Sequence, residues 1–216
     1  MTKYNLNKDY FNSIDTEHKA YWLGYILADG HVMHKKTEAN RRYYLMIQSI
    51  DEWFCNNIKL ALNSTHPVKT VGKGGFEGSK TNYRITFTSK ALAAVLITYK
   101  EAMTIPSIDS SLIHHFVRGF FDGDGSVYTY NKKCKTKSYP WLECSMIANS
   151  TMQTALVNTL TAAGIKSRIK KSKTAWMNYV VVSNKADNKL FYEWLYKDAT
   201  IYLPRKHNVF SNYYAP

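Results

Sequence analysis

The sequence predicts an α+β protein made of two similar halves, each in the order helix, two strands, helix, two strands, helix. Two short stretches carry this prediction: AYWLGYILADGHV at 20–32 and FVRGFFDGDGSV at 116–127. Both run from aromatic and aliphatic residues through a glycine to an acid and another glycine, and then to a β-branched residue. Asp29 and Asp124 hold the same place in the two stretches. We interpret the pattern as a tandem duplication, with pseudo-symmetric repeats at 1–108 and 109–216.

Hydrophobic periodicity predicts the same order of elements after each stretch. In the first half, strands are expected at 31–36, 41–50 and 82–89, helices at 51–63 and 90–102, and a glycine-rich turn at 71–80. In the second half, strands are expected at 126–133, 141–150 and 178–184, a basic segment at 168–173, and helices at 151–164 and 189–199. The segment 105–115, with Pro106 and an Asp/Ser cap region, is the expected joint between the halves.

Composition favours a folded intracellular protein. The chain has 216 residues, 45% of them hydrophobic and 14% aromatic, which is enough for one large core or two small ones. It contains no apolar run of about 18 residues, so no membrane helix is expected. The N-terminus lacks the apolar block of a signal peptide. We expect a cytoplasmic protein in a bacterial or phage context, with an organelle as the alternative.

Small residues in the repeated stretches predict a close contact between two helices. Gly24 and Ala28 are four residues apart and share a helix face, as do Gly119 and Gly123. Two such faces can pack closely around a pseudo-two-fold axis, which would bring the ends of the helices together. Asp29 and Asp124 would then meet, each followed by a glycine of the kind that ends helices in the left-handed conformation.

Two aspartates at adjoining helix ends predict a divalent-metal site. Each helix C-terminus is already electronegative, so the two carboxylates repel each other unless cations enter. Oxygen-only ligation suits Mg²⁺, and such metals can activate water and neutralise a leaving oxygen in phosphodiester hydrolysis. The alternative is that both acids are ordinary helix-terminal groups, which two copies in matching context disfavour.

Net charge predicts a nucleic acid partner. The chain carries 29 Lys+Arg against 16 Asp+Glu, a formal charge of +13. The basic clusters are interleaved with tyrosine and tryptophan, which is typical of nucleic-acid binding. A two-stranded β-ribbon fits the DNA major groove, so strand residues could reach the bases while neighbouring lysines bind phosphates. A register slip of one residue would turn such a reader away from the DNA. The candidate contacts are Lys35, Arg41, Arg84, Tyr128, Tyr130, Lys132, Arg168, Lys170, Lys171 and Asn178.

The nonapeptides WLGYILADG at 22–30 and VRGFFDGDG at 117–125 resemble the signature of the LAGLIDADG homing endonucleases of the monomeric, two-motif type. The similarity extends over nearly the whole chain, including LYKDATIYLPRKHNVF at 195–210. The resemblance implies a central two-helix LAGLIDADG interface flanked by antiparallel sheets that form a DNA-binding saddle. It also implies an intron-encoded monomer that cuts both strands of a long, roughly pseudo-palindromic DNA target with a divalent metal.

The resemblance further implies roles for individual residues. Asp29 and Asp124 would be metal-binding catalytic acids, with the carbonyls of Ala28 and Gly123 as further ligands. The metal would be Mg²⁺, with Mn²⁺ able to substitute and Ca²⁺ supporting binding without cleavage. Polar residues that order water in this family, and the family's active-site lysine, align with the following positions: Asp51, Asn149, Gln48 and Lys206.

The two halves differ at two aligned positions. Aligning IPSID with LPRKH puts Ile108 where Lys206 stands, so we expect the two strand-cleavage steps to differ in rate unless Lys100 serves instead. Asp122 stands where the first motif has Leu27, which favours a salt bridge or cap over metal ligation.

Two other functions of the same fold stay open. One is an RNA maturase, and the other is a DNA-binding regulator that does not cleave. Retention of both acids favours the endonuclease over a purely binding role.

Overall fold

The computed structural model describes residues 4–36, 41–73, 81–134, 137–172 and 178–215. The first half contains α1 (Glu17–Asp29), β1 (His31–Lys36), β2 (Arg41–Ser49), α2 (Glu52–Ala61), β3 (Lys69–Lys73), β4 (Thr81–Thr88) and α3 (Lys90–Ala102). The second half contains the 3-10 turn η1 (Ser110–Leu112), then α4 (Ile113–Asp124), β5 (Gly125–Cys134), β6 (Lys137–Ala148), α5 (Ser150–Ala162), β7 (Arg168–Lys170), β8 (Asn178–Val182), α6 (Lys185–Leu195) and α7 (Pro204–Tyr214).

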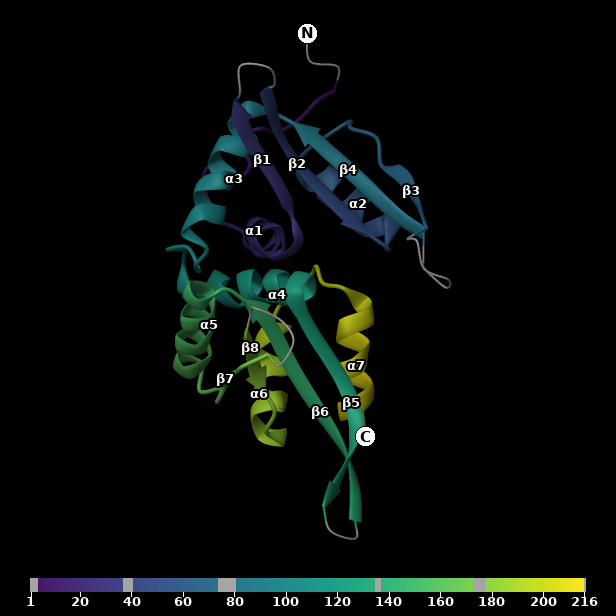
Figure 1. Cartoon of the computed structure of the whole chain (residues 1–216), viewed down its shortest axis with the longest axis vertical. Coiled ribbons are helices and arrows are strands. Elements are labelled where there is room, and N and C mark those ends of the chain that lie inside the picture. The colour runs from purple at the N-terminus through teal and green to yellow at the C-terminus, as the bar shows by residue number, and fades with distance from the viewer. Residues whose placement is uncertain (1–3, 37–40, 74–80, 135–136, 173–177, 216) are drawn as a thin grey trace.

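Each half folds into a four-stranded antiparallel sheet, and the two sheets have matching strand orders. The first is β1-β2-β4-β3 and the second is β5-β6-β8-β7 (Figure 1). This duplication confirms the predicted α+β class with two pseudo-repeats. The proposed boundary between residues 108 and 109 falls between α3 and η1 and stays a prediction.

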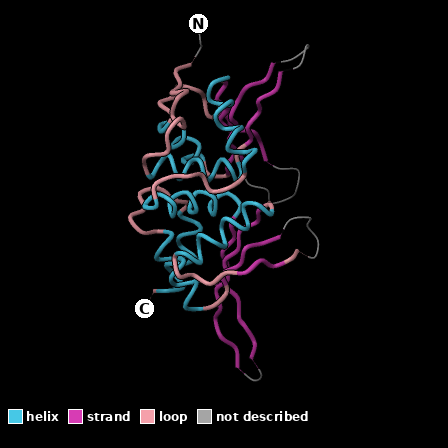
Figure 2. Tube along the Cα trace, turned by 90° about the vertical axis from the view of Figure 1, so that its left-hand side faces the viewer, coloured by secondary structure: helices cyan, strands magenta, loops and turns pink. Residues whose placement is uncertain are grey.

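One face of each sheet is covered by helices, and the other face is not. Leu142, Cys144, Met146 and Ala148 alternate along β6 and are buried, while the residues between them are partly exposed. This period of two marks a strand with one face in the core. Figure 2 shows the strands of both sheets on one side of the molecule and the helices on the other. The uncovered sides, here called the outer faces, therefore lie on the same side.

The two halves differ in two elements. The β5–β6 hairpin is paired from Gly125↔Met146 to Cys134↔Lys137 and projects well beyond its sheet in Figure 1, whereas the β1–β2 pairing runs from His31↔Met46 to Lys36↔Arg41. The second half also ends in α7, which the sequence pattern did not predict. Its apolar signal is weak, because Lys206 and Phe210 are the two residues that it buries. Within the described residues, none of the helices is long and apolar enough to cross a membrane.

The predicted close contact between α1 and α4 is present at the centre of the molecule (Figure 1). A methyl group added at Gly24 would overlap the carbonyl oxygen of Phe116 on α4. One added at Gly119 would overlap the carbonyl oxygen of Tyr21 on α1. The helices thus touch backbone to backbone, and only glycine permits that approach at these two positions.

The glycines that follow the two aspartates are not left-handed, contrary to expectation. Gly30 has φ −74° and Gly125 has φ −89°, both in the extended region. The chain passes directly from each helix into a strand, so no left-handed turn is needed. Glycine is required there by space instead, because a Cβ at Gly30 would lie 2.7 Å from the Cα of Ile26. Gly164, after α5, has φ 76° and is left-handed.

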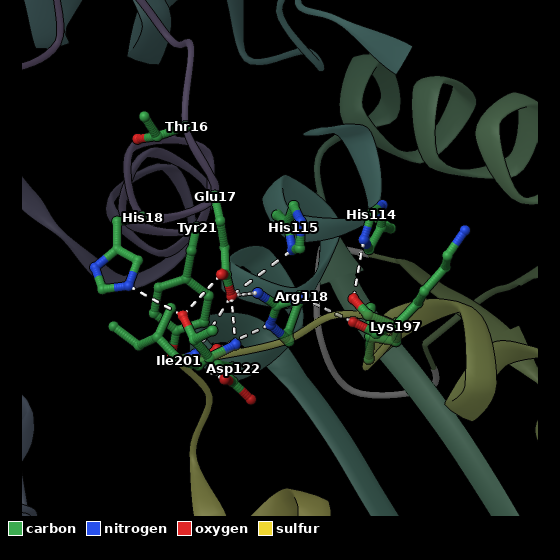
Figure 3. A network of polar contacts seen from close by, with 12 residues as sticks. Thr16, Glu17, His18, Tyr21, His114, His115, Arg118, Asp122, Lys197 and Ile201 are labelled. Atoms are coloured by element: carbon green, nitrogen blue, oxygen red, sulfur yellow. Dashed lines mark hydrogen bonds and ion pairs between the residues drawn. The ribbon is translucent and has the colours of Figure 1, made fainter. Parts of the chain in front are cut away.

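An ion pair joins the first residue of α1 to the middle of α4 (Figure 3). Arg118 is fully buried, and its Nη2 donates to Oε1 of Glu17 at 2.6 Å. Its Nε and Nη1 donate to the carbonyls of Ile201 and Leu195, both at 2.9 Å. A buried guanidinium is tolerated only when its donors are satisfied in this way.

The same ion pair also holds the segment 196–203, which leads from α6 to α7. Glu17 Oε1 accepts a hydrogen bond from the Thr200 backbone N–H at 2.7 Å, and Oε2 accepts from the Thr200 hydroxyl at 2.7 Å. His18 contacts the same hydroxyl through Nε2 at 3.1 Å. One carboxylate therefore links the first repeat to the loop that positions α7.

Replacing Gly119 by alanine should be strongly destabilising. The added methyl would meet the α1 backbone, which cannot move aside as a flexible side chain can, so we expect a loss above about 3 kcal/mol. Gly72→Ala is the control, because nothing lies within 4 Å of its added Cβ and its φ of 77° gives a cost of about 1 kcal/mol. Chemical denaturation measures both, and equal losses would contradict backbone contact at Gly119.

Acid should destabilise the protein partly through His115. Burial, then the positive charge of Arg118, then His114 lower the pKa of His115 to about 4. The unfolded chain takes up this proton near pH 6.5, and the folded protein resists it, so stability is lost as pH falls from 6.5 towards 4. The loss should reach about 2–3 kcal/mol. His115→Phe should flatten that part of the stability curve, and His34→Phe on exposed β1 should not; parallel curves for all three proteins would rule the assignment out.

Candidate active site and nucleic-acid interface

Asp29 and Asp124 come together where α1 and α4 end. A Cβ built at Gly123 would lie 3.4 Å from the Cβ of Asp29, so the residue before Asp124 packs on Asp29 itself. Desolvation, and then the charge of Asp29, raise the pKa of Asp124 to about 6. Desolvation also raises the pKa of Asp29, against a hydrogen bond from the Tyr25 hydroxyl at 3.2 Å. The two carboxyls thus share one electrostatic environment.

A lysine binds each of these helix ends. Lys100 Nζ donates to the carbonyl of Leu27 at 3.1 Å. Lys206 Nζ donates to the carbonyls of Phe121 at 2.6 Å, Asp122 at 2.9 Å and Gly125 at 2.5 Å. Leu27 and Asp122 hold equivalent places, each two residues before its aspartate.

The first half therefore has a lysine at its helix end, supplied by Lys100 in the last turn of α3 rather than by a residue at position 108. Ile108 packs against the core instead. Lys206 comes from the first turn of α7, so the two lysines reach equivalent places from different elements. Burial lowers the pKa of both lysines, that of Lys206 to about 8. The positive charges of both lysines act against the rise in the pKa of Asp29 and Asp124 that desolvation causes.

Asp122, for which a salt bridge or cap was favoured over metal ligation, is held by hydrogen bonds. It is 1% exposed, and its Oδ2 accepts from the Tyr21 hydroxyl at 2.8 Å and from the Leu203 N–H at 2.8 Å. Leu203 immediately precedes α7. Asp122 therefore fixes the start of the helix that carries Lys206.

Arg205 is a cation of this site that sequence reasoning missed. Its Nε lies 3.6 Å from Oδ2 of Asp51, and its charge lowers the pKa of Asp29. The available signal was its place beside Lys206 in LPRKH. Arg205 belongs to the second repeat but acts on two acids of the first.

The other predicted polar residues take different places. Asp51 and Asn149 are the N-cap residues of α2 and α5, which supports their alignment with each other. The Asn149 side chain accepts from the Met152 N–H at 2.9 Å and so acts as a helix cap. Gln48 lies on the outer face, where its Oε1 accepts from Nε and Nη2 of Arg84 at 3.1 and 2.8 Å. Among these three residues, Asp51 is the one paired with Arg205, whose charge acts on Asp29.

The donor set at Asp29 and Asp124 fits a hard divalent cation. Two carboxylates adjoin helix-end carbonyls, all oxygen donors of the kind that Mg²⁺ takes. In the described part of the chain, no three His, Cys, Asp or Glu side chains gather as a metal cluster, so a zinc-type site of nitrogen and sulfur ligands is not indicated there. Lys100 and Lys206 hold carbonyls adjacent in sequence to Ala28 and Gly123, the two predicted carbonyl ligands.

The outer face of the second sheet presents aromatic and basic residues. Tyr128 and Tyr130 are 45% and 38% exposed, and their rings lie 5.8 Å apart. Lys132, two residues further on, sits with Nζ 3.8 Å from the ring centre of Trp141. The Tyr128 hydroxyl donates to Glu143 on the neighbouring strand at 2.9 Å. Residues at spacing two on β5 therefore project to one side, as predicted.

Strand register corrects one predicted DNA contact. Asn178 pairs with Ala148, which is buried on the helix-covered side, and its carbonyl accepts from Gln153 of α5 at 3.4 Å. Tyr179 pairs with Ile147 and Lys170, and this row belongs to the outer face. The one-residue difference arises because strand faces alternate.

The remaining basic residues predicted to contact DNA lie in different parts of the structure. Arg168 lies in the same outer-face series of β7 as Lys170, and it donates to the Ser183 hydroxyl at 2.9 Å. Lys171 is exposed just after β7. Lys35 and Arg41 are in paired strands, but their side chains lie outside the described part of the structure.

Comparison with known proteins gives one family match and several matches of fold. Residues 111–195 match the family model of the LAGLIDADG-like domain. The whole chain is similar to a mutant of I-SmaMI, with 13% identity and a TM-score of 0.63 over 89% of this chain and 88% of that one. It is similar to LAGLIDADG meganuclease I-AabMI bound to uncleaved DNA, with 13% identity and a TM-score of 0.61 over 88% of each chain.

It is also similar to homing endonuclease I-WcaI bound to its DNA recognition sequence, with 20% identity and a TM-score of 0.58 over 93% of this chain and 90% of that one. A search of curated proteins found no match to this sequence.

Proposed function

We propose that this chain, whose residues 111–195 form a LAGLIDADG-like domain and whose overall fold is that of the LAGLIDADG homing endonucleases, is a site-specific endonuclease that cuts both strands of DNA. The observation that carries the proposal is the convergence of Asp29 and Asp124 between two sheets whose uncovered outer faces carry aromatic and basic side chains. A binding protein has no need to bring two desolvated acids together, because they would repel the phosphates of its ligand.

The proposed substrate is a long double-stranded target, and the proposed active form is a monomer. Each sheet would contact one half of a roughly pseudo-palindromic site, because the two sheets are related repeats. One chain supplies both aspartates, so no second copy is needed to complete the centre. An intracellular location and an intron-encoded gene accord with a DNA substrate and remain predictions.

In the proposed mechanism, Mg²⁺ or Mn²⁺ held by Asp29 and Asp124, with the carbonyls of Ala28 and Gly123, would supply an activated water and neutralise the leaving oxygen. The contribution of the protein is to hold these oxygens in place before substrate binds. Lys100 and Lys206 hydrogen-bond to the carbonyls of Leu27 and Asp122, near the aspartates, and would keep positive charge beside the scissile phosphates.

Cleavage of a randomised duplex library tests the function, because such a library contains many candidate targets at once. The protein is incubated with the library in Mg²⁺, and the cut ends are sequenced. We expect cut products that share one extended motif, with breaks on both strands. Binding and enrichment of a motif without cuts would instead support a regulator, and binding of structured RNA alone would support a maturase.

Asp29→Asn and Asp124→Asn should each reduce Mg²⁺-dependent cleavage at least about 100-fold, because each removes a charged ligand of the metal. Binding of the selected duplex in Ca²⁺ should stay nearly intact in both variants. Asp15→Asn makes the same charge change in an exposed acid that pairs with Lys19, and it should cleave like the original protein. Cleavage at the original rate by either active-site variant would refute the assignment.

Arg205→Gln should slow one strand cut more than the other. Arg205 lies 3.6 Å from Asp51, and its charge acts on Asp29, whereas the cations that act on Asp124 are Lys100 and Lys206. Loss of its charge should slow one cut about tenfold, so nicked plasmid should accumulate before linear product. Arg205→Lys should restore part of the rate, and Lys189→Gln on α6 should have no effect. Equal slowing of both cuts would show that Arg205 does not distinguish the strands.

A further inference from the structure

A groove of about 1300 Å³ lies at one end of the first sheet, away from the aspartates. It is lined by residues 4–8, by residues between 63 and 69, and by residues of β4 and the start of α3. In Figure 1, the N-terminal segment is at the top of the molecule and the β5–β6 hairpin is at the bottom, with α1 and α4 between them. We call this feature the N-terminal groove.

The N-terminal groove is strongly basic. Four of its lining residues are cations, Lys8, Lys69, Arg84 and Lys90, and none of the described residues that line it is acidic. The three lysines are exposed. Asp9 follows Lys8 in the chain but does not line the groove. Four positive charges around one open cavity favour an extended anionic ligand.

The N-terminal segment that lines the groove is held in place by hydrogen bonds within the protein. The Asn5 N–H donates to the Thr65 hydroxyl at 2.8 Å, and the Thr65 N–H donates to the Asn5 carbonyl at 3.2 Å. The Asn7 N–H donates to the carbonyl of Leu62 at 2.8 Å. These bonds tie the N-terminal segment to the loop after α2. A preformed wall reduces the ordering cost of binding.

Part of the groove reaches the outer face of the first sheet, the surface on which DNA is proposed to lie. Arg84, Thr86 and Thr88 line it, and they alternate with the buried Ile85 and Phe87, so they belong to the outer face. The β3–β4 pairing ends at Lys69↔Arg84, which leaves the rest of β4 open along this edge. From residue 84 to 88, β4 covers about 13 Å, the axial length of about four base pairs.

We propose that the N-terminal groove binds the phosphate backbone of the DNA that flanks the half-site of the first repeat. Lysines on separate elements suit a repeating chain of phosphates better than one base edge. The second repeat extends outward with its long β5–β6 hairpin instead, so the two flanks of the target are bound by different structures. This inference rests on the proposed DNA binding but not on cleavage.

The salt dependence of binding to a long duplex of random sequence tests the proposal, because phosphate contacts need no target sequence. Lys8→Gln/Lys90→Gln should weaken binding and reduce the slope of log affinity against log salt by about two. Its loss of affinity between about 50 and 200 mM salt should then be about tenfold smaller than that of the original protein. The matched control, Lys59→Gln/Lys189→Gln, removes the same charge from α2 and α6 on the helical side.

Equal changes of slope in the two double variants would overturn the proposal, because the effect would then be one of net charge. Thermal unfolding of each variant checks that the folds are equally stable. Titration with inorganic phosphate distinguishes a site for free anions. Saturable phosphate binding that Lys8→Gln/Lys90→Gln abolishes, together with an unchanged slope on DNA, would also overturn the assignment to DNA.

Discussion

The backbone contact between α1 and α4 is the constraint on which the rest of the structure depends. Gly24 and Gly119 face the opposite helix without side chains, so two helices from different repeats approach at their backbones. That approach sets the distance between the sheets and places both helix ends at one point. The proposed metal site depends on this packing, because each aspartate comes from a different repeat.

Charge is distributed unevenly along this helix pair. At the start of α1, Glu17 pairs with the buried Arg118, and both also hydrogen-bond to residues between the end of α6 and the start of α7. At the other end, two acids are desolvated and repel each other, with cations around them. Removal of one partner from the first arrangement would leave a charge without its counter-ion, and binding of a cation would relieve the repulsion in the second. Because α7 is tied to both ends, the structural ion pair also positions Lys206.

Local patterns predicted much of the fold and the two central acids. Strands with one buried face and the repeated stretch around Asp29 and Asp124 are properties of neighbouring residues, so one sequence reveals them. The contributions of Lys100 and Arg205 were harder to infer, because α3 and α7 bring them to the site from distant parts of the chain. The predicted DNA contact at Asn178 was wrong by one residue, because strand register depends on pairing between strands rather than on composition. The predicted left-handed conformation of Gly30 was wrong, because glycine is required there by lack of space for a side chain and not by a turn.

The most direct test is an anomalous diffraction map from crystals of the protein grown with Mn²⁺ and its selected duplex. The account predicts manganese density at the junction of α1 and α4, within ligand distance of both the Asp29 and Asp124 carboxylates and next to a backbone phosphate of each strand. Manganese bound elsewhere, or carboxylates too far apart to share a centre, would contradict it.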